Sequence, residues 1–181
     1  MTNQYAETTA APVLEWRAPE TFPDNVRPCS LWPWLVETES LTARLRARCP
    51  TGFRVRVLSS GDADLTADEA EWTGRSHGFL REVHLCCGET PWVYARTLVM
   101  NGGDSEARLR GLGEKPLGDW AFEQDATWRD ALEVARLDHA ALPAALAEAV
   151  ALWGRRSVLR TGDDALYISE YFLDGVTTPW R

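Results

Sequence analysis

The chain has 181 residues, a length typical of a single domain. Hydrophobic residues make up 45% and charged residues 25%, a globular composition that excludes a wholly disordered or fibrous protein. The formal net charge of -8 repels nucleic acid and anionic lipid at long range, so we expect neither as a partner. No segment reaches the roughly 18 apolar residues of a membrane span, and the first residues lack the basic start and apolar run of a secretory signal. These features predict a cytoplasmic protein.

The cysteines do not form a recognisable metal site. Cys29, Cys49, Cys86 and Cys87 have no CxxC spacing, and the three histidines stand at no metal-ligand spacing from them or from one another. We therefore expect no metal. In a reducing cytoplasm we also expect the thiols to be free.

The first part of the chain alternates irregular and regular segments. Residues 1–28 are rich in proline and lack periodicity, so we expect a tail or surface wrap before a domain over residues 29–181. The spacing of leucines predicts a helix over Leu31–Arg48, and alternation predicts a strand over Phe53–Leu58. Residues 59–77 are acidic and contain glycine, with a short helix expected around Thr66–Trp72.

Two hairpins dominate the rest of the pattern. Gly88–Pro91 joins the predicted strands Phe79–Cys87 and Trp92–Met100, and a turn at 161–164 joins Arg156–Arg160 to Ala165–Leu173. Between the hairpins we expect a short helix over Ser105–Leu112, a loop over 113–118 and an Ala-rich helix over Leu142–Leu152, whereas Trp128–Ala135 fits helix or strand. The order of elements predicts a single α+β domain with an antiparallel sheet.

Three charged residues share strand faces that otherwise resemble core. Alternation places Arg81 with Phe79, Val83 and Leu85, Arg96 with Trp92, Tyr94 and Leu98, and Glu170 with Leu166, Ile168 and Phe172. An unpaired buried charge costs several kcal/mol, on the order of 3–5, so these residues need partners. One interpretation is a structural ion pair between Glu170 and one arginine. The other is an internal pocket in which the surplus arginine binds a carboxylate ligand.

A second pair of arginines, Arg155 and Arg156, follows Trp153-Gly154. These two could extend a basic mouth of the pocket, or they could have helix-end or solvated-strand roles. No GxSxG elbow, GxGxxG or P-loop pattern is present. The inventory favours chemistry without a cofactor on a small acidic molecule.

At the same residues the sequence resembles the chorismate pyruvate-lyase (chorismate lyase) family. The matching stretches are 79–86 (FLREVHLC), Pro91-Trp92 through Arg96-Thr97, Leu112-Gly113 through Pro116-Leu117-Gly118, 152–157 (LWGRRS) and 169–173 (SEYFL). The resemblance implies a single α+β domain with an antiparallel six-stranded sheet and helical flaps over an internal ligand pocket. It also implies that Trp128–Ala135 is a strand. Leu137–Ala151 looks like an insertion that adds the Ala-rich helix.

The resemblance further implies the activity. Members convert chorismate to 4-hydroxybenzoate and pyruvate, the first step of ubiquinone biosynthesis, without metal or organic cofactor. Carried over by position, Arg81 and Glu170 match the ligand-binding arginine and glutamate, and Arg96 matches a second pocket arginine. Leu117 matches a flap leucine whose backbone contacts the ligand, and Leu41 stands where a ligand-contacting methionine is familiar.

These matches give an expected mechanism. Arg81 and Arg96 would bind the two carboxylates of chorismate, and Glu170 would hold the 4-hydroxyl with a pKa raised by its apolar neighbours. Leu41 and Leu117, on the flaps, would exclude water and gate product release. The alternative is a non-catalytic sensor domain of the same fold, as in some transcription regulators. We expect a monomer whose small-molecule partners are chorismate and 4-hydroxybenzoate.

Overall fold

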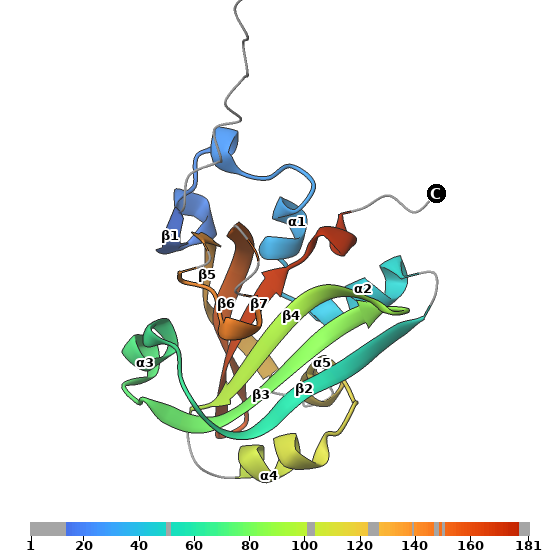
Figure 1. The fold of residues 1–181 in the computed structure, drawn as a ribbon, viewed down its shortest axis with the longest axis vertical. Helices are drawn as coiled ribbons and strands as arrows, with labels where there is room; N and C mark the ends of the chain where they lie inside the picture. Colours follow the sequence, from blue (N-terminus) through green and yellow to red (C-terminus); the bar gives the residue numbers. More distant parts are fainter. Residues whose placement is uncertain are drawn as a thin grey trace, which may run out of the picture.

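The computed structural model describes residues 14–177, except 50–51, 101–103, 123–126, 139, 147–148 and 150. Its centre is one antiparallel sheet in the order β1-β5-β6-β7-β4-β3-β2 (Figure 1). The strands are β1 Leu14–Arg17, β2 Phe53–Asp64, β3 His77–Cys87, β4 Thr90–Val99, β5 Thr127–Asp138, β6 Ala151–Thr161 and β7 Asp164–Phe172. The predicted α+β class, both hairpins and the strand over Trp128–Ala135 are confirmed.

The sheet has seven strands, so the expectation of six is wrong. The additional strand is β1, whose Leu14 and Arg17 pair with Arg136 and Val134 of β5. Of the predicted tail, residues 14–28 are thus packed on the domain, whereas residues 1–13 lie outside the described residues. Phe22 is 1% exposed and packs against the rings of Trp32 and Trp153 at 5.7 and 6.0 Å.

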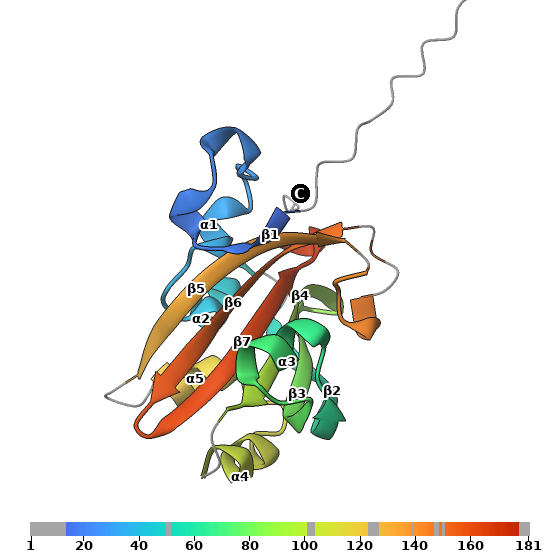
Figure 2. The same ribbon diagram turned by 90° about the vertical axis from the view of Figure 1, so that its left-hand side faces the viewer.

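Helices cover both faces of the sheet. They are α1 Trp32–Leu35, α2 Leu41–Arg48, α3 Ala67–Thr73, α4 Asp104–Gly111 and α5 Leu117–Phe122, with short 3-10 helices η1 Pro19–Thr21, η2 Asp24–Val26, η3 Ala144–Leu146 and η4 Asp174–Val176. In Figure 2, α3 lies in front of the strands and α2 and α5 lie behind them. We call the face toward α2, α4 and α5 the inner face, and the face toward α3 the outer face. None of the helices in the described part of the chain is long and apolar enough to cross a membrane.

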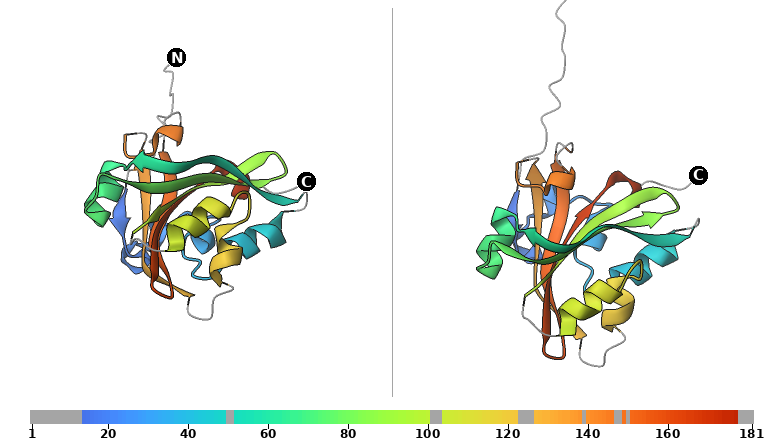
Figure 3. Two further views of the ribbon diagram at one scale, coloured as in Figure 1. Left: turned by 90° about the horizontal axis from the view of Figure 1, so that it is seen from below. Right: turned by 60° about the horizontal axis from the view of Figure 1, so that its bottom comes forward.

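The inner face carries most of the hydrophobic core. Leu35 and Leu45, from α1 and α2, pack with Val83 of the sheet in one buried cluster. Leu109 of α4 packs with Leu159 and other residues of the sheet in a second cluster. Seen from below in Figure 3, α2, α4 and α5 lie together on one side of the curved sheet, and α3 lies on the other. The sheet and these helices therefore form two sides of an enclosed interior.

Two predicted helices take another form. Leu31–Arg48 is two helices, because Ser40 caps α2 by accepting a hydrogen bond of 3.2 Å from the Ala43 amide and thereby starts a new helix. The Ala-rich helix over Leu142–Leu152 is wrong: its described part holds only η3 before β6 begins at Ala151. Pairing of β6 with β5 overrides the helix propensity of alanine there. Positions 139, 147–148 and 150 of the predicted insertion lie outside the described residues.

Other boundaries move by a few residues. β2 continues through the segment expected to be irregular as far as Asp64, because it pairs with β3 along its whole length. The predicted short helix after it is α3, which begins with a capping box formed by Thr66 and Glu69. The loop predicted over 113–118 ends two residues early, because α5 begins at Leu117.

A disulfide joins Cys49 to Cys87, so the expectation that all thiols are free is wrong for this pair. Cys29 and Cys86 are free. Cys49 is the C-cap residue of α2 and Cys87 is the last residue of β3. The bond therefore ties the end of one covering helix to the sheet beneath it.

Candidate active site

A cavity lies between the inner face of the sheet and the helices α2 and α5. Its walls are mainly apolar, with two arginines and one carboxylate among them. The lining residues are Leu41, Thr42, Val55, Arg81, Val83, Leu85, Ala95, Thr97, Pro116, Leu117, Gly118, Arg129, Leu159, Ile168 and Glu170. Of the residues expected in a pocket, Arg81, Glu170, Leu41 and Leu117 are brought together here.

Strand register explains why the polar residues converge. Arg81 of β3 is paired with Thr97 of β4, Thr97 with Ile168 of β7, and Ile168 with Ser157 of β6. Residues paired directly across adjacent strands point to the same face of the sheet. These four side chains consequently form one row across the inner face, with Arg81 at one end.

Glu170 lies in the neighbouring row. It is paired with Ala95 of β4 on one side and with Arg155 of β6 on the other. Its Oε2 accepts a hydrogen bond of 2.6 Å from Nε of Arg155, and among the described residues Oε1 has no hydrogen bond. Arg155 thus fixes one of the two carboxylate oxygens of Glu170.

The charge state of Glu170 differs from the expected one. Burial raises its pKa, but Arg155 and Arg129 oppose burial, and their combined effect leaves the pKa below the ordinary value. The sequence-based expectation of a raised pKa is wrong because it considered the apolar neighbours of Glu170 on β7 and not Arg155 on the adjacent strand. Glu170 is therefore an ionised hydrogen-bond acceptor at neutral pH.

Arg155 is a structural partner of this carboxylate. Its side chain is fully buried, and its Nη1 donates to the carbonyl oxygens of Trp34 at 3.1 Å and Glu37 at 2.5 Å. Arg155 thus holds the segment before α2 against Glu170. The roles expected from the sequence were a basic mouth of the pocket, a helix end or a solvated strand, and none of them agrees with a buried position within β6.

Arg81 is buried without a carboxylate partner among the described residues. Its Nη2 donates to the carbonyl oxygens of Gly113 and Lys115, at 2.8 and 3.2 Å, in the segment that leads into α5. Burial lowers the pKa of this guanidinium below its ordinary value. Arg81 therefore brings a positive charge to the cavity and at the same time positions the segment before α5.

Arg129 is a cavity residue that the sequence analysis missed. Its side chain is 5% exposed, and its Nη1 lies 3.9 Å from Oε2 of Glu170 and also donates to Oγ of Ser157. Among the described residues its Nε has no partner. Burial, together with the charge of Arg155, lowers its pKa to about 10, so it remains a cation at neutral pH.

A β-bulge accounts for the omission. Register shifts between Asp130 and Glu133, and Ala131 has a positive φ of 49°. Regular alternation would place Arg129 and Val134 on opposite faces, yet Arg129 lines the cavity and Val134 is packed in the inner-face core. No feature of the local sequence marks this change of face.

Arg96, by contrast, is not in the cavity, and the expectation that it shares a pocket with Arg81 is wrong. Arg96 is paired with Glu82 and Ser169, so it points to the outer face. There its Nε and Nη2 donate to the two carboxylate oxygens of Glu69 on α3, at 2.7 and 2.9 Å, and its Nη1 donates to Glu82. These partners raise the pKa of the guanidinium against the effect of burial. Arg96 therefore forms a structural ion pair with Glu69 and not with Glu170.

The two helices over the cavity, α2 and α5, are in close contact. At Gly118, the second residue of α5, a Cβ atom would lie 3.0 Å from Oγ1 of Thr42 and 3.1 Å from Oγ of Ser40. At the protein surface the guanidinium of Arg46 on α2 donates to both oxygens of Asp119 on α5, at 2.8 and 2.6 Å. Two contacts thus join α2 to α5 above the cavity.

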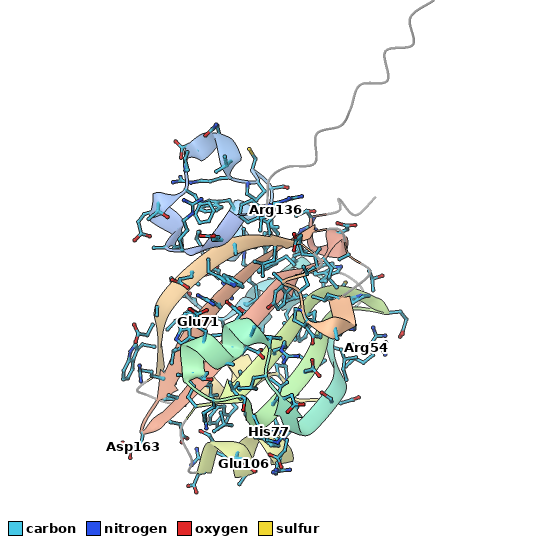
Figure 4. The ribbon with its side chains drawn as sticks, turned by 60° about the vertical axis from the view of Figure 1, so that its left-hand side comes forward. Arg54, Glu71, His77, Glu106, Arg136 and Asp163 are labelled. Atoms are coloured by element: carbon cyan, nitrogen blue, oxygen red, sulfur yellow. A yellow bond between two sulfur atoms is a disulfide. The ribbon has the colours of Figure 1, made fainter. Side chains whose placement is uncertain are left out.

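The buried charges differ from the many charged residues at the surface. Figure 4 labels several of the latter, including Asp163 at the tip of the β6–β7 hairpin and Arg54 on β2, which extend away from the molecule. Within the described residues, no group of three His, Cys, Asp or Glu side chains is placed to hold a metal ion. Arg81, Arg129, Arg155 and Glu170 therefore make up the charged part of the site.

Comparison with known proteins identifies the family. The family model described as chorismate lyase matches residues 14–179. A probable chorismate pyruvate-lyase of Chromohalobacter salexigens is 41% identical over 145 residues, which cover 78% of this chain and 79% of the relative. A relative with the same description from Shewanella sp. (strain W3-18-1) is 37% identical over 83% of this chain and 83% of its own length. Another, from Azoarcus sp. (strain BH72), is 37% identical over 88% of this chain and 89% of its own length. The solved structure of a possible transcriptional regulator from Bacillus subtilis covers 73% of this chain and 62% of its own at a TM-score of 0.41 and 12% identity, too distant to bear on function. The chain belongs to the chorismate lyase family.

Proposed function

We propose that this chain converts chorismate to 4-hydroxybenzoate and pyruvate in the cavity between the sheet and the helices α2 and α5. The observation that carries the proposal is the position of Arg81 and Glu170, which line one apolar cavity in a chain that the family model matches over residues 14–179. In the family this reaction is the entry to ubiquinone biosynthesis. No contact described around Glu170 favours the alternative, a non-catalytic sensor domain.

The reaction needs positioning and charge stabilisation more than it needs a reactive group. Chorismate carries a ring carboxylate and, on the carbon next to the hydroxyl-bearing carbon, an enolpyruvyl ether with a second carboxylate. The ring C–O bond breaks and its electron pair leaves with enolpyruvate, while the hydroxyl-bearing carbon loses its hydrogen as a proton and the ring becomes aromatic. Enolpyruvate gains one proton at its methylene carbon and becomes pyruvate, so the overall reaction neither consumes nor releases a proton. Aromatisation supplies the driving force.

The residues of the cavity suit this substrate. Apolar side chains such as Val83, Leu85 and Ile168 fit the two faces of a flat ring. Arg81 provides a cation with little competition from carboxylates, which suits the ring carboxylate. Ionised Glu170, with Oε1 unoccupied, accepts a hydrogen bond from the 4-hydroxyl and favours loss of the proton from the carbon that bears it.

The helices α2 and α5 act as flaps in this proposal. Leu41 and Leu117 cover the ring, exclude water from it and delay the departure of 4-hydroxybenzoate, which retains the ring carboxylate and the hydroxyl. Product release then depends on separation of α2 from α5. The proposed enzyme is a monomer.

The direct test is incubation of the purified protein with chorismate in the presence of a chelator. Following 4-hydroxybenzoate by absorbance and pyruvate by a coupled assay should show equal amounts of both. Absence of pyruvate, with tight binding of chorismate by calorimetry, would favour the sensor. Activity that disappears in chelator would contradict the cofactor-independent mechanism.

A further inference from the structure

The cavity contains more positive than negative charge. Arg155 and Arg129 lie 2.6 and 3.9 Å from the carboxylate of Glu170, and Arg81 is a third buried arginine that lines the same cavity, so these four residues carry two surplus positive charges. Buried charges without counter-ions are costly, and a site retains them where a ligand supplies the opposite charge. The surplus therefore matches a dianion better than a monocarboxylate.

The three arginines are not equally available to a ligand. Arg155 donates to Glu170 and to the carbonyls of Trp34 and Glu37 and does not line the cavity, although its buried Nη2 has no partner among the described residues. Arg81 and Arg129 do line it, and neither forms a hydrogen bond with a carboxylate of the described chain. These two are the arginines that a ligand can reach.

Arg129 in particular lacks the partners that a buried guanidinium needs. Its described contacts are one hydrogen bond to Ser157 and an approach of 3.9 Å to Glu170, while the buried Nε has no acceptor. A guanidinium of this kind can offer Nε and one terminal nitrogen side by side, which is the fork that binds a carboxylate through two parallel hydrogen bonds. Arg129 is itself one of the residues that line the cavity.

Position separates the tasks of the two arginines. The ring carboxylate and the 4-hydroxyl stand at opposite ends of the chorismate ring, whereas the enolpyruvyl ether is attached beside the hydroxyl. Arg129 lies next to Glu170, and Arg81 lies on β3 at the other end of its row. A substrate whose hydroxyl meets Glu170 thus directs its ether arm to Arg129 and its ring carboxylate to Arg81.

We propose that Arg129 binds the carboxylate of the enolpyruvyl arm, and that it distinguishes substrate, which has this carboxylate, from 4-hydroxybenzoate, which does not. The inference rests on the proposed function for the identity of the substrate. Arg129 takes the place that the sequence analysis had given to Arg96.

The test compares two stable ligands in calorimetry, 4-hydroxybenzoate and 3-(carboxymethoxy)-4-hydroxybenzoate, the latter carrying a second carboxylate at the ether position. Wild-type protein should prefer the dicarboxylate by about 10- to 100-fold, the value of a charged hydrogen-bonded pair. Arg129→Gln should abolish this preference and leave the affinity for 4-hydroxybenzoate within about threefold. Arg81→Gln should weaken both ligands by similar factors.

Kinetics with chorismate provide a second measurement. Arg129→Gln should lower kcat/KM by about 100-fold while the inhibition constant of 4-hydroxybenzoate stays nearly constant. Arg129→Lys keeps the charge but not the paired guanidinium nitrogens, so an intermediate loss of kcat/KM is expected. This variant provides the test if Arg129→Gln does not fold. The matched control is Arg160→Gln on β6, because the Arg160 side chain is 41% exposed, pairs with Asp130 and does not line the cavity.

Two results would overturn the inference. One is an Arg129→Gln or Arg129→Lys protein that keeps the full preference for the dicarboxylate. The other is an equal loss of affinity for both ligands, which would mean that Arg129 shapes the site without binding the second carboxylate. Failure of the proposed function looks different: wild-type protein would show the arginine-dependent preference yet release no pyruvate from chorismate.

Discussion

Nε of Arg155 donates a hydrogen bond of 2.6 Å to Oε2 of Glu170 across two adjacent strands, β6 and β7. The bond explains how a carboxylate can be buried in a mainly apolar cavity and still be ionised. It also fixes the orientation of the carboxylate, since one of its two oxygens is held. Glu170 is thus half of an ion pair and a candidate ligand-binding residue at once, although the sequence analysis had treated these as alternatives.

Replacing Glu170 separates its two contributions. Glu170→Gln keeps the shape and can still accept from Arg155, but it loses the negative charge. We expect turnover to fall by about 100-fold or more, with the free energy of unfolding reduced by up to about 3 kcal/mol because Arg155 loses its counter-ion. Single-turnover kinetics and thermal unfolding measure both. Normal turnover in the remaining folded protein, with a large loss of stability, would restrict Glu170 to a structural role.

The lowered pKa of Glu170 predicts a pH dependence of stability. In the unfolded chain a Glu has a pKa of about 4.3, and the folded value is lower. Above about pH 4.3 the ionised residue contributes its full stabilisation; as the pH falls toward the folded pKa, the unfolded state binds the proton first and stability declines. Acid unfolding of Glu170→Gln should therefore be less steep between about pH 5 and pH 3 than that of wild type.

The same pKa predicts the pH profile of activity. A carboxylate that is already ionised contributes no titration to kcat/KM between about pH 6 and pH 8. The wild-type profile should show no ionisation in this range that Glu170→Gln removes. Finding such an ionisation would mean that ligand binding or closure of the helices raises the pKa of Glu170 into the range of a general acid.

Arg81→Ala should abolish two functions of one side chain. It removes a cation from the cavity and the two hydrogen bonds to Gly113 and Lys115, so kcat/KM should fall by at least about 100-fold and 4-hydroxybenzoate should bind about 10- to 100-fold more weakly. Arg75→Ala is a suitable control, because Arg75 also donates to two backbone carbonyls, those of Val99 and Met100, but does not line the cavity. Activity of Arg81→Ala within a few-fold of wild type would remove it from the site.

Gly118→Ala tests the contact between the two covering helices. The added methyl group meets the side-chain oxygens of Thr42 and Ser40 at 3.0 and 3.1 Å, so these side chains or α5 itself must shift by a few tenths of an ångström and loosen the contact. We expect faster product release, seen as weaker inhibition by 4-hydroxybenzoate together with a changed kcat. Gly111→Ala on α4 is the matched control, since nothing lies within 4 Å of its Cβ position. If Gly118→Ala and Gly111→Ala behave alike, product release does not depend on the contact between α2 and α5.

The disulfide predicts a redox effect on the same movement. A dithiol reductant would convert Cys49 and Cys87 to two thiols, with two electrons and two protons supplied by the reductant, and release the end of α2 from β3. We expect a lower melting temperature and weaker retention of 4-hydroxybenzoate after reduction, and the same in Cys49→Ser. Cys29→Ser, at an exposed free cysteine, should leave both properties unchanged with and without reductant. Identical inhibition constants for reduced and oxidised protein would contradict the coupling.

Alternation along the strands predicted some of the site because the hairpins are regular where Arg81 and Glu170 stand. It could not separate Arg81 from Arg96, because helices cover both faces of β4 and both faces are consequently buried. Alternation also could not find Arg129, since a bulge at Ala131 changes the face to which the strand directs its residues. The Ala-rich segment before β6 misled for a related reason: strand pairing, which local sequence does not encode, outweighs propensity there.

The pairing of β4 with β7 joins two parts of the chain that are distant in sequence, since Val93 is opposite Phe172. The β2–β3–β4 meander supplies Arg81, and the β5–β6–β7 meander supplies Arg129 and Glu170, so the cavity is divided between an early and a late segment. During synthesis the first meander emerges with an unpaired edge at β4 and with Arg81 lacking the rest of its row. The pairing of β4 with β7 near the centre of the sheet can form only after β7, the last strand, has been synthesised. Contacts of such long sequence separation slow folding. Ligand-binding capacity therefore arises in one late step, and neither meander alone can provide it.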